Sequence, residues 1–119
     1  MKLSNGREAI VDSRKIANYC LSPDHDDGRH KARLFHALVG LNQDNADLLV
    51  DALREAAVSG DAAVGQVDRY GRRYVIDFEF TGPNGTAVIR SAWIVRTGEN
   101  MPRLVTCYIL RPANPQADG

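Results

Sequence analysis

Four basic side chains, Arg29, His30, Lys31 and Arg33, lie in the first turn of a predicted helix and could together bind an anion. A helix start presents unpaired backbone N–H groups and a partial positive charge. Cationic side chains at that end are favourable mainly when an anion or an acidic group offsets them. The pattern therefore indicates a site for an anionic group.

Lys31 differs from its neighbours in the direction in which it projects. At about 100° per residue it lies between the directions of Leu38 and Phe35, so its stem starts on the apolar side of its helix. Its ammonium group either reaches out from the edge of the core or is held in a cleft between helix and sheet, aimed at a phosphate or a developing oxyanion. His30 and Arg33 project to a more polar side, where His30 is either solvated or catalytic.

The segment before this helix contains His25 among Asp24, Asp26 and Asp27, which are potential metal ligands. Their spacing does not match a calcium loop, and no second histidine or cysteine cluster has zinc spacing. We expect no metal here, with Asp27 as the N-cap of the helix. The sequence has no glycine-rich phosphate loop, nucleophile elbow or dinucleotide fingerprint, so we also expect no cofactor.

The composition is that of one ordinary domain of 119 residues, with 44% hydrophobic residues. We expect a single domain over residues 1–111 and a disordered polar tail over 112–119. The 15 basic and 15 acidic side chains cancel, which argues against long-range steering of nucleic acid. No segment predicts a signal peptide or a membrane span, so we expect a cytoplasmic protein without a membrane partner.

Cys20 and Cys107 could bridge, but reduced core thiols are the more common case.

Hydrophobic periodicity predicts N-terminal helices packed on a mainly antiparallel β-meander of four to five strands, an α+β fold. In the third helix the predicted buried residues are Leu48, Leu49, Ala52, Leu53 and Ala56. The predicted helices span residues 13–21, 28–38 and 46–58, and the predicted strands span residues 8–11, 63–69, 73–80, 86–95 and 103–110.

The turn at Gly82 to Gly85 sets a register for the central hairpin, because it places Thr81 opposite Thr86. Asp77 then faces Arg90, so Arg90 is either a structural ion pair or a phosphate ligand. The same register pairs Phe78 with Ile89 and Tyr74 with Trp93.

Strict alternation along the last strand places Thr106 and Tyr108 on the face that carries Trp93, and Cys107 and Ile109 on the opposite face. Both faces of the sheet are rather apolar in this arrangement. Helices on one side cover only one face, so the other needs a ligand, a partner protein or a homodimer formed through the sheet.

The strongest motif is Gly-x-His-Lys-Ala-Arg-x-Phe over residues 28–35, accompanied by Lys15 to Leu21, Thr81 to Gly85 and Pro102 to Tyr108. With these segments, residues 7–110 resemble a bacterial family of uncharacterised small domains. Members of that family occur alone or at the ends of large secreted toxin-like proteins. The resemblance implies the α+β fold and a role connected with toxins.

More loosely, the chain is similar to the barnase–EndoU–colicin–RelE superfamily of metal-independent ribonucleases, which pair N-terminal helices with an antiparallel sheet. In such toxins a basic residue near the helices and a Thr or Tyr late in the last strand often line the active site. Together with the cationic helix start, this resemblance gives two sets of candidates. The catalytic candidates are Lys31, His30, Thr106 and Tyr108, and the phosphate-binding candidates are Arg29, Arg33, Arg90 and Arg103.

Two functions remain open from the sequence. The first is a toxin-type ribonuclease that cleaves RNA by attack of a 2′-hydroxyl, with RNA as substrate and a cognate immunity or antitoxin protein as partner. The second is a non-enzymatic interaction or immunity-type binding module that dimerises through its sheet. Neutral net charge and the two apolar sheet faces favour the second, whereas the resemblance to toxin nucleases favours the first and places it slightly ahead.

Overall fold

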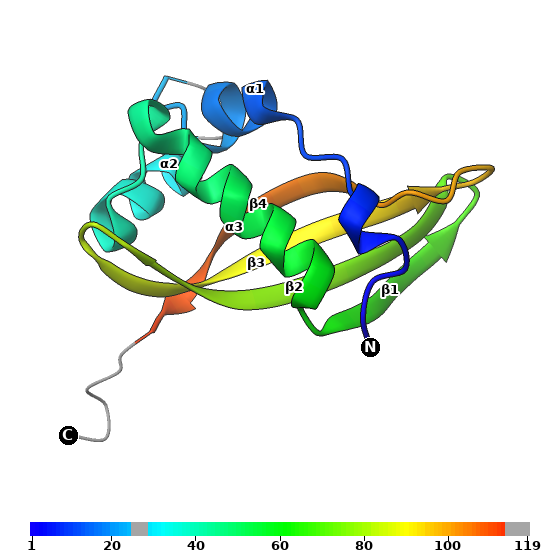
Figure 1. Cartoon of the computed structure of the whole chain (residues 1–119). Helices are drawn as coiled ribbons and strands as arrows, with labels where there is room; N and C mark the ends of the chain where they lie inside the picture. Colours follow the sequence, from blue (N-terminus) through cyan, green and yellow to red (C-terminus); the bar gives the residue numbers. More distant parts are fainter. Residues whose placement is uncertain (25–28, 114–119) are drawn as a thin grey trace.

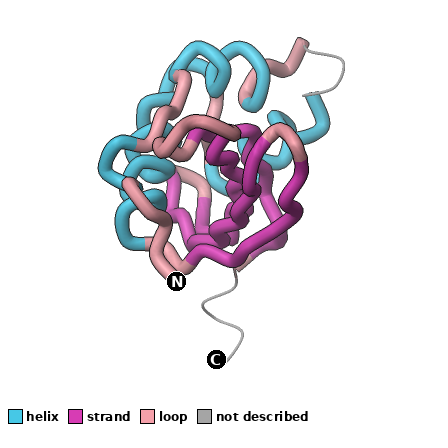
Figure 2. Tube along the Cα trace, turned by 90° about the vertical axis from the view of Figure 1, so that its right-hand side faces the viewer, coloured by secondary structure: helices cyan, strands magenta, loops and turns pink. Residues whose placement is uncertain are grey.

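The computed structural model describes residues 1–24 and 29–113, and it has the α+β arrangement expected from the sequence. The helices lie on one face of a four-stranded antiparallel sheet with strand order β1-β2-β3-β4 (Figures 1 and 2). The helical elements are η1 (Gly6–Glu8), α1 (Ser13–Lys15), η2 (Ile16–Cys20), α2 (Arg29–Leu34), η3 (Phe35–Val39), η4 (Gln43–Asn45) and α3 (Ala46–Ser59). The strands are β1 (Ala62–Asp68), β2 (Gly71–Gly82), β3 (Gly85–Arg96) and β4 (Arg103–Pro112). Within the described ranges, no helix has the length and apolar character needed to cross a bilayer.

The first two predicted helices are present, each as an α-helical turn or two that continues into a wider π-helical turn. The Asp12 side chain caps α1 by accepting hydrogen bonds from the backbone N–H groups of Arg14 and Lys15, at 3.0 and 3.4 Å. η3 ends at Gly40, whose φ of 74° lies in the left-handed region that glycine adopts without strain. Asp27, the expected cap of α2, lies outside the described residues.

The third predicted helix, α3, is confirmed with a shifted buried face. Asn42 accepts a hydrogen bond from the backbone N–H of Asp44, and the Asn45 side chain accepts one from the backbone N–H of Asn42. Leu48 is 42% exposed rather than buried, and Ala52 is only half-buried. The buried face is turned by one residue from the expected stripe, and it consists of Leu49, Val50, Leu53, Ala56 and Ala57.

The predicted strand over residues 8–11 is wrong apart from one residue. Ile10 forms an isolated parallel bridge beside Arg103, with its N–H donating to the Pro102 carbonyl at 2.9 Å. Residues before it turn tightly, since Gly6–Glu8 is a short 3-10 helix. The chain therefore passes the free edge of β4 at a single point, near the start of that strand.

The predicted register of the central hairpin is confirmed. Thr81 lies opposite Thr86 and Asp77 opposite Arg90, as do the other predicted pairs. Gly82 pairs with Gly85, so the connection is a two-residue loop whose Asn84 donates to the His36 carbonyl at 3.1 Å. A β-carbon on Gly82 would lie 2.0 Å from the Val39 carbonyl oxygen. Glycine at this position lets the hairpin tip pack against the end of η3.

The predicted faces of β4 are wrong because the strand contains two bulges. Thr106 pairs with Ala92 and Leu104 with Trp93, which leaves Val105 as an extra residue on β4. The extra residue reverses the alternation, so Cys107 and Ile109 face the helices and Thr106 and Tyr108 lie on the opposite face. A second bulge, at Leu110, separates Ile109 from Arg111.

Trp93 lies at the centre of the core between sheet and helices, where it is fully buried. Its indole N–H donates to the Ser91 hydroxyl at 2.9 Å, and that hydroxyl donates to the Ile76 carbonyl at 2.8 Å. Ser91 is also fully buried. One serine thus satisfies the polar groups of two neighbouring core residues.

Ser91→Ala is expected to lower the free energy of unfolding by about 1–3 kcal/mol, because it leaves the buried Trp93 N–H without an acceptor. Denaturant titration measures this change. In a Trp93→Phe background the same substitution should cost less, since phenylalanine has no N–H to satisfy. Equal costs in both backgrounds would contradict this account of Ser91.

Candidate functional site

The ammonium group of Lys31 lies beside β4, in contact with side chains from β4 and η2. Its Nζ donates a hydrogen bond to Thr106 Oγ1 at 3.3 Å, across 75 residues of sequence. It also lies 5.4 Å from the ring centre of Tyr108 and 5.8 Å from that of Tyr19. Both distances are within the range of cation–π attraction. The structure thus brings together three of the four catalytic candidates.

This arrangement follows from the position of β4 and its bulge. β4 is an edge strand, and α2 lies against it on the helix side. The bulge at Val105 turns Thr106 and Tyr108 toward the face that the helices do not cover. Lys31 therefore reaches from the helix layer past the sheet edge, and its long apolar stem is half-buried on the way.

Arg90 lies on the same face of the sheet as Thr106 and Tyr108, where it forms an ion pair with Asp77. Its Nε and one terminal nitrogen donate to the two carboxylate oxygens of Asp77 at 2.8 and 2.9 Å, a bidentate pair. Hydrogen bonding to Asp77 raises the pKa of Arg90 above its ordinary value, with a smaller contribution from the neighbouring Tyr108 hydroxyl. Asp77, Arg90 and Tyr108 occupy one row across β2, β3 and β4. Of the two roles that the sequence left open for Arg90, the structure shows the ion pair, which borders the Lys31 cluster through Tyr108.

The Arg90 pairing makes stability depend on pH through Asp77. Its hydrogen bonds to Arg90 hold the pKa of the Asp77 carboxyl below the usual value near 4. The stabilisation is fully present above about pH 4 and is lost as pH falls through the lower folded-state pKa.

Asp77→Asn is therefore expected to lower the free energy of unfolding at pH 6, by an amount that shrinks toward zero below about pH 4. Urea titrations at several pH values measure the difference. Asp51→Asn, at an exposed position on α3, is the matched control and should show no such dependence. A constant difference for Asp77→Asn from pH 6 to pH 3 would contradict the assignment.

The contacts of the Lys31 ammonium group, with Thr106, Tyr108 and Tyr19, include none of the remaining cationic candidates. Arg103 is paired with Glu99 at 3.0 Å, at the start of β4. That contact holds the pKa of Glu99 below its ordinary value. Arg29, His30 and Arg33 are exposed on α2. The structure therefore separates the candidates into a compact cluster around Lys31 and an exposed basic strip along α2.

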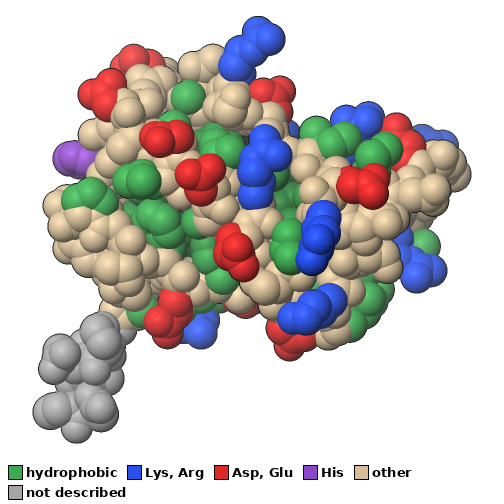
Figure 3. Space-filling model, in the orientation of Figure 1, with side chains coloured by type: hydrophobic (Ala, Val, Ile, Leu, Met, Phe, Trp, Pro, Cys, Tyr) green, Lys and Arg blue, Asp and Glu red, His purple; other side chains and the backbone are tan. Residues whose placement is uncertain are grey.

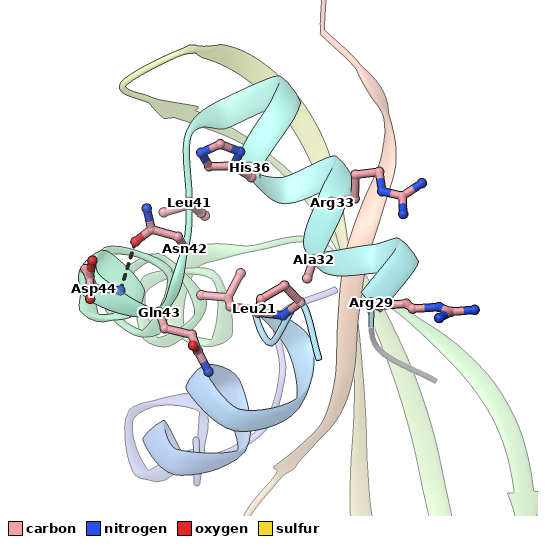
Figure 4. Close-up of a pocket in the computed structure, with 10 residues that line it drawn as sticks. Leu21, Arg29, Ala32, Arg33, His36, Leu41, Asn42, Gln43 and Asp44 are labelled. Atoms are coloured by element: carbon pink, nitrogen blue, oxygen red, sulfur yellow. Dashed lines mark hydrogen bonds between the residues drawn. The ribbon is translucent and has the colours of Figure 1, made fainter. Parts of the chain in front are cut away.

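Arg29 and Arg33 also line a pocket of about 440 Å³ between α2, η4 and the segment that follows η2 (Figure 4). The close-up shows both guanidinium groups turned away from Asn42 and Asp44 on the far wall. Within that wall the Asn42 side chain is occupied with the backbone N–H of Asp44 at 2.8 Å. The arginine stems thus form a wall of the pocket, while their charges are presented to the surface. The lining residues are Leu21, Pro23, Arg29, Ala32, Arg33, His36, Leu41, Asn42, Gln43 and Asp44.

Sequence reasoning missed Tyr19 as a member of the Lys31 cluster. Tyr19 lies three residues after Ile16, a helical spacing that is typical of residues on the buried side of a helix. Ile16 is fully buried, whereas Tyr19 is half-buried at the edge of η2 and contributes its ring to the enclosure of Lys31. The signal available in the sequence was an aromatic residue at the border of the apolar stripe.

Charges of both signs are interspersed on the helical face of the molecule (Figure 3). This agrees with the balanced total of 15 basic and 15 acidic side chains. Across residues 1–24 and 29–113, no three His, Cys, Asp or Glu side chains gather as a metal-binding group.

The fold and the site define a small α+β domain with a lysine–threonine–tyrosine cluster at the edge of its sheet. The chain belongs to the family described as "Domain of unknown function (DUF6883)", whose model matches residues 2–111. No curated protein matches the sequence.

Among solved structures, the chain is similar to one in a contact-dependent growth inhibition toxin–immunity protein complex from Klebsiella pneumoniae 342. The alignment has a TM-score of 0.63 and 19% sequence identity, and it covers 83% of this chain and 97% of the other. At this identity the likeness establishes only that this chain shares its fold with a chain of that toxin–immunity protein complex.

Proposed function

We propose that this domain is a toxin-type ribonuclease whose reaction uses no metal ion, and that its active site is the Lys31 cluster. The observation that carries the proposal is the 3.3 Å contact between Lys31 Nζ and Thr106 Oγ1, with the Tyr108 ring 5.4 Å from the same ammonium group. A cation and two hydroxyl-bearing side chains on the helix-free face suit an anionic substrate such as the RNA backbone.

In the proposed reaction a ribose 2′-hydroxyl attacks the adjacent phosphorus, and the 5′-oxygen of the next nucleotide leaves. The products are a 2′,3′-cyclic phosphate and a 5′-hydroxyl. The step needs a base for the 2′-hydroxyl proton, an acid for the leaving oxygen, and positive charge beside the phosphate. We assign the charge to Lys31, the proton transfers to His30 and Tyr108, and a hydrogen bond to a phosphate oxygen to Thr106.

The arginines divide into two roles in this proposal. Arg29 and Arg33 present their charges on the exposed side of α2 and bind neighbouring phosphates. Arg90 and Arg103 are already bound to Asp77 and Glu99, so they are poor phosphate ligands. We assign Arg90 instead to positioning the Tyr108 hydroxyl, which lies next to it on the sheet.

Because the proposed substrate is RNA, we propose that the domain acts in the cytoplasm. A cognate immunity protein is its expected inhibitor.

The test is incubation of the purified domain with RNA in the presence of a chelator, followed by analysis of the fragment ends. Fragments with 2′,3′-cyclic phosphate and 5′-hydroxyl ends are expected. An oligonucleotide with a single ribose among deoxyriboses should be cut only after that ribose. RNA that stays intact at high protein concentration would remove the proposal.

A second candidate is the immunity-type binding module, favoured by the uncovered face of the sheet. That face has Val75, Ala92 and Ile94 along its middle, without a helix from the described residues above them. The charged pairs of Arg90 and Arg103 border these residues and make the face mixed rather than uniformly apolar. A concentration-dependent dimer by light scattering, together with absence of RNA cleavage, would favour this second function.

A further inference from the structure

The two cysteines form a buried thiol pair beside the Lys31 cluster. Cys20 is the last residue of η2 and Cys107 lies on the helix side of β4, and both are free thiols with no exposed surface. The Cys20 sulfur accepts hydrogen bonds from the thiol and from the backbone N–H of Cys107. Residues far apart in the sequence are therefore held with their sulfur atoms facing one another.

The surroundings divide the two thiols into a nucleophile and a partner. The hydrogen bond from the Cys107 thiol, with lesser help from Lys31 and Lys15, lowers the pKa of Cys20 to about 7. The same hydrogen bond, together with burial, raises the pKa of Cys107. The lowered pKa favours the thiolate form of Cys20, which is the form that attacks oxidants and disulfides.

We propose that Cys20 and Cys107 are a redox-active pair that closes to an intramolecular disulfide when the domain meets a peroxide. The Cys20 thiolate attacks one oxygen of hydrogen peroxide, which breaks the O–O bond and yields a sulfenic acid and, after protonation, water. The Cys107 sulfur then attacks the sulfenic sulfur and releases a second water. Two thiols are oxidised and one peroxide is reduced, and a dithiol reductant reverses the change.

A disulfide between Cys20 and Cys107 would affect the neighbouring Lys31 cluster. Cys107 lies between Thr106 and Tyr108 in the sequence, and Cys20 follows Tyr19. These three neighbours surround the Lys31 ammonium group. A covalent bond would fasten η2 to β4 and would remove a negatively charged thiolate from the vicinity of Lys31. Oxidation is therefore expected to change the site without requiring any exposed cysteine.

The experiment treats the purified domain with hydrogen peroxide, then alkylates it under denaturing conditions and measures its mass. We expect both thiols to escape alkylation, with an intact mass about 2 Da lower than that of the reduced protein. A peptide linking the segments of Cys20 and Cys107 should appear, and dithiothreitol should remove it. The oxidised form should also unfold at a temperature higher by roughly 5 °C or more, because the bond closes a long loop.

Two single variants make the result specific to this pair. In Cys107→Ser, Cys20 should still react with peroxide and be trapped as a sulfenic acid by dimedone. In Cys20→Ser, the buried Cys107 should react much more slowly. The proposal is overturned if the native protein keeps both thiols after treatment, forms only an intermolecular bond, or oxidises Cys20 without linking it. None of these readouts requires RNA, so the result is independent of the proposed nuclease activity.

Discussion

Lys31→Ala is expected to reduce RNA cleavage by a factor of about 10²–10³ while leaving the domain folded. The ammonium group is the cation that lies among Thr106, Tyr108 and Tyr19. Loss of one preorganised charge at a reacting phosphate typically has an effect of this size. Single-turnover cleavage assays measure the change, and far-UV circular dichroism checks the fold.

Two variants make this result informative. Lys2→Ala removes the same charge from an exposed lysine that contacts the Ser59 carbonyl at 2.9 Å, far from the cluster, and it should cleave RNA at the wild-type rate. Lys31→Arg retains the charge but places a planar guanidinium group where the two rings leave room for a compact ammonium, so it should rescue cleavage only partly. Equal activity in Lys31→Ala and the wild type would exclude Lys31 from the reaction.

Trp93→Ala is expected to lower the free energy of unfolding by about 3–5 kcal/mol, the largest stability effect that we predict for a single residue. The indole is fully buried, pairs across the sheet with Tyr74 and Leu104, and bonds to Ser91. Alanine would leave a cavity and a serine hydroxyl without its donor. Since a domain of this size is stable by only about 5–15 kcal/mol, much of its stability would be lost.

Urea titration monitored by circular dichroism at 222 nm, the usual wavelength for helical signal, measures this loss. Tyr70→Ala is the matched control, because Tyr70 is an aromatic residue that is 59% exposed. The control should change the free energy of unfolding by no more than about 0.5 kcal/mol. Similar values for both variants would show that Trp93 is not the central packing element of this core.

The sequence predicted those parts of the fold that depend on local rules. The turn at residues 82–85 determined the pairing of Asp77 with Arg90. The helices predicted over residues 28–38 and 46–58 end within one residue of the expected positions, before Gly40 and Gly60. The orientation of α3 was less accessible, because Leu48 and Leu49 are equally apolar. Only the packing of neighbouring elements decides which of the two faces the sheet.

Three members of the Lys31 cluster, Lys31, Thr106 and Tyr108, were predictable from the sequence, but Tyr19 and the way the cluster is built were not. Lys31 and Thr106 are in contact, as expected from residue type and resemblance. Thr106 lies on the opposite face of the sheet from the one that strict alternation predicted. A bulge has no strong local signature at Val105, so the reversal of faces was not visible in the sequence. The contact with Tyr19 depends on how η2 packs beside α2, which is a tertiary property.

The extra residue at Val105 has a consequence for how this strand tolerates variation in length. Deleting one residue between Leu104 and Thr106 would restore regular pleating, send both hydroxyl-bearing side chains into the interior and turn Cys107 outward. Conservative replacement of Val105 changes none of this. Insertions and deletions here should therefore be far more damaging than point substitutions, which makes chain length at this position a determinant of whether the cluster can exist.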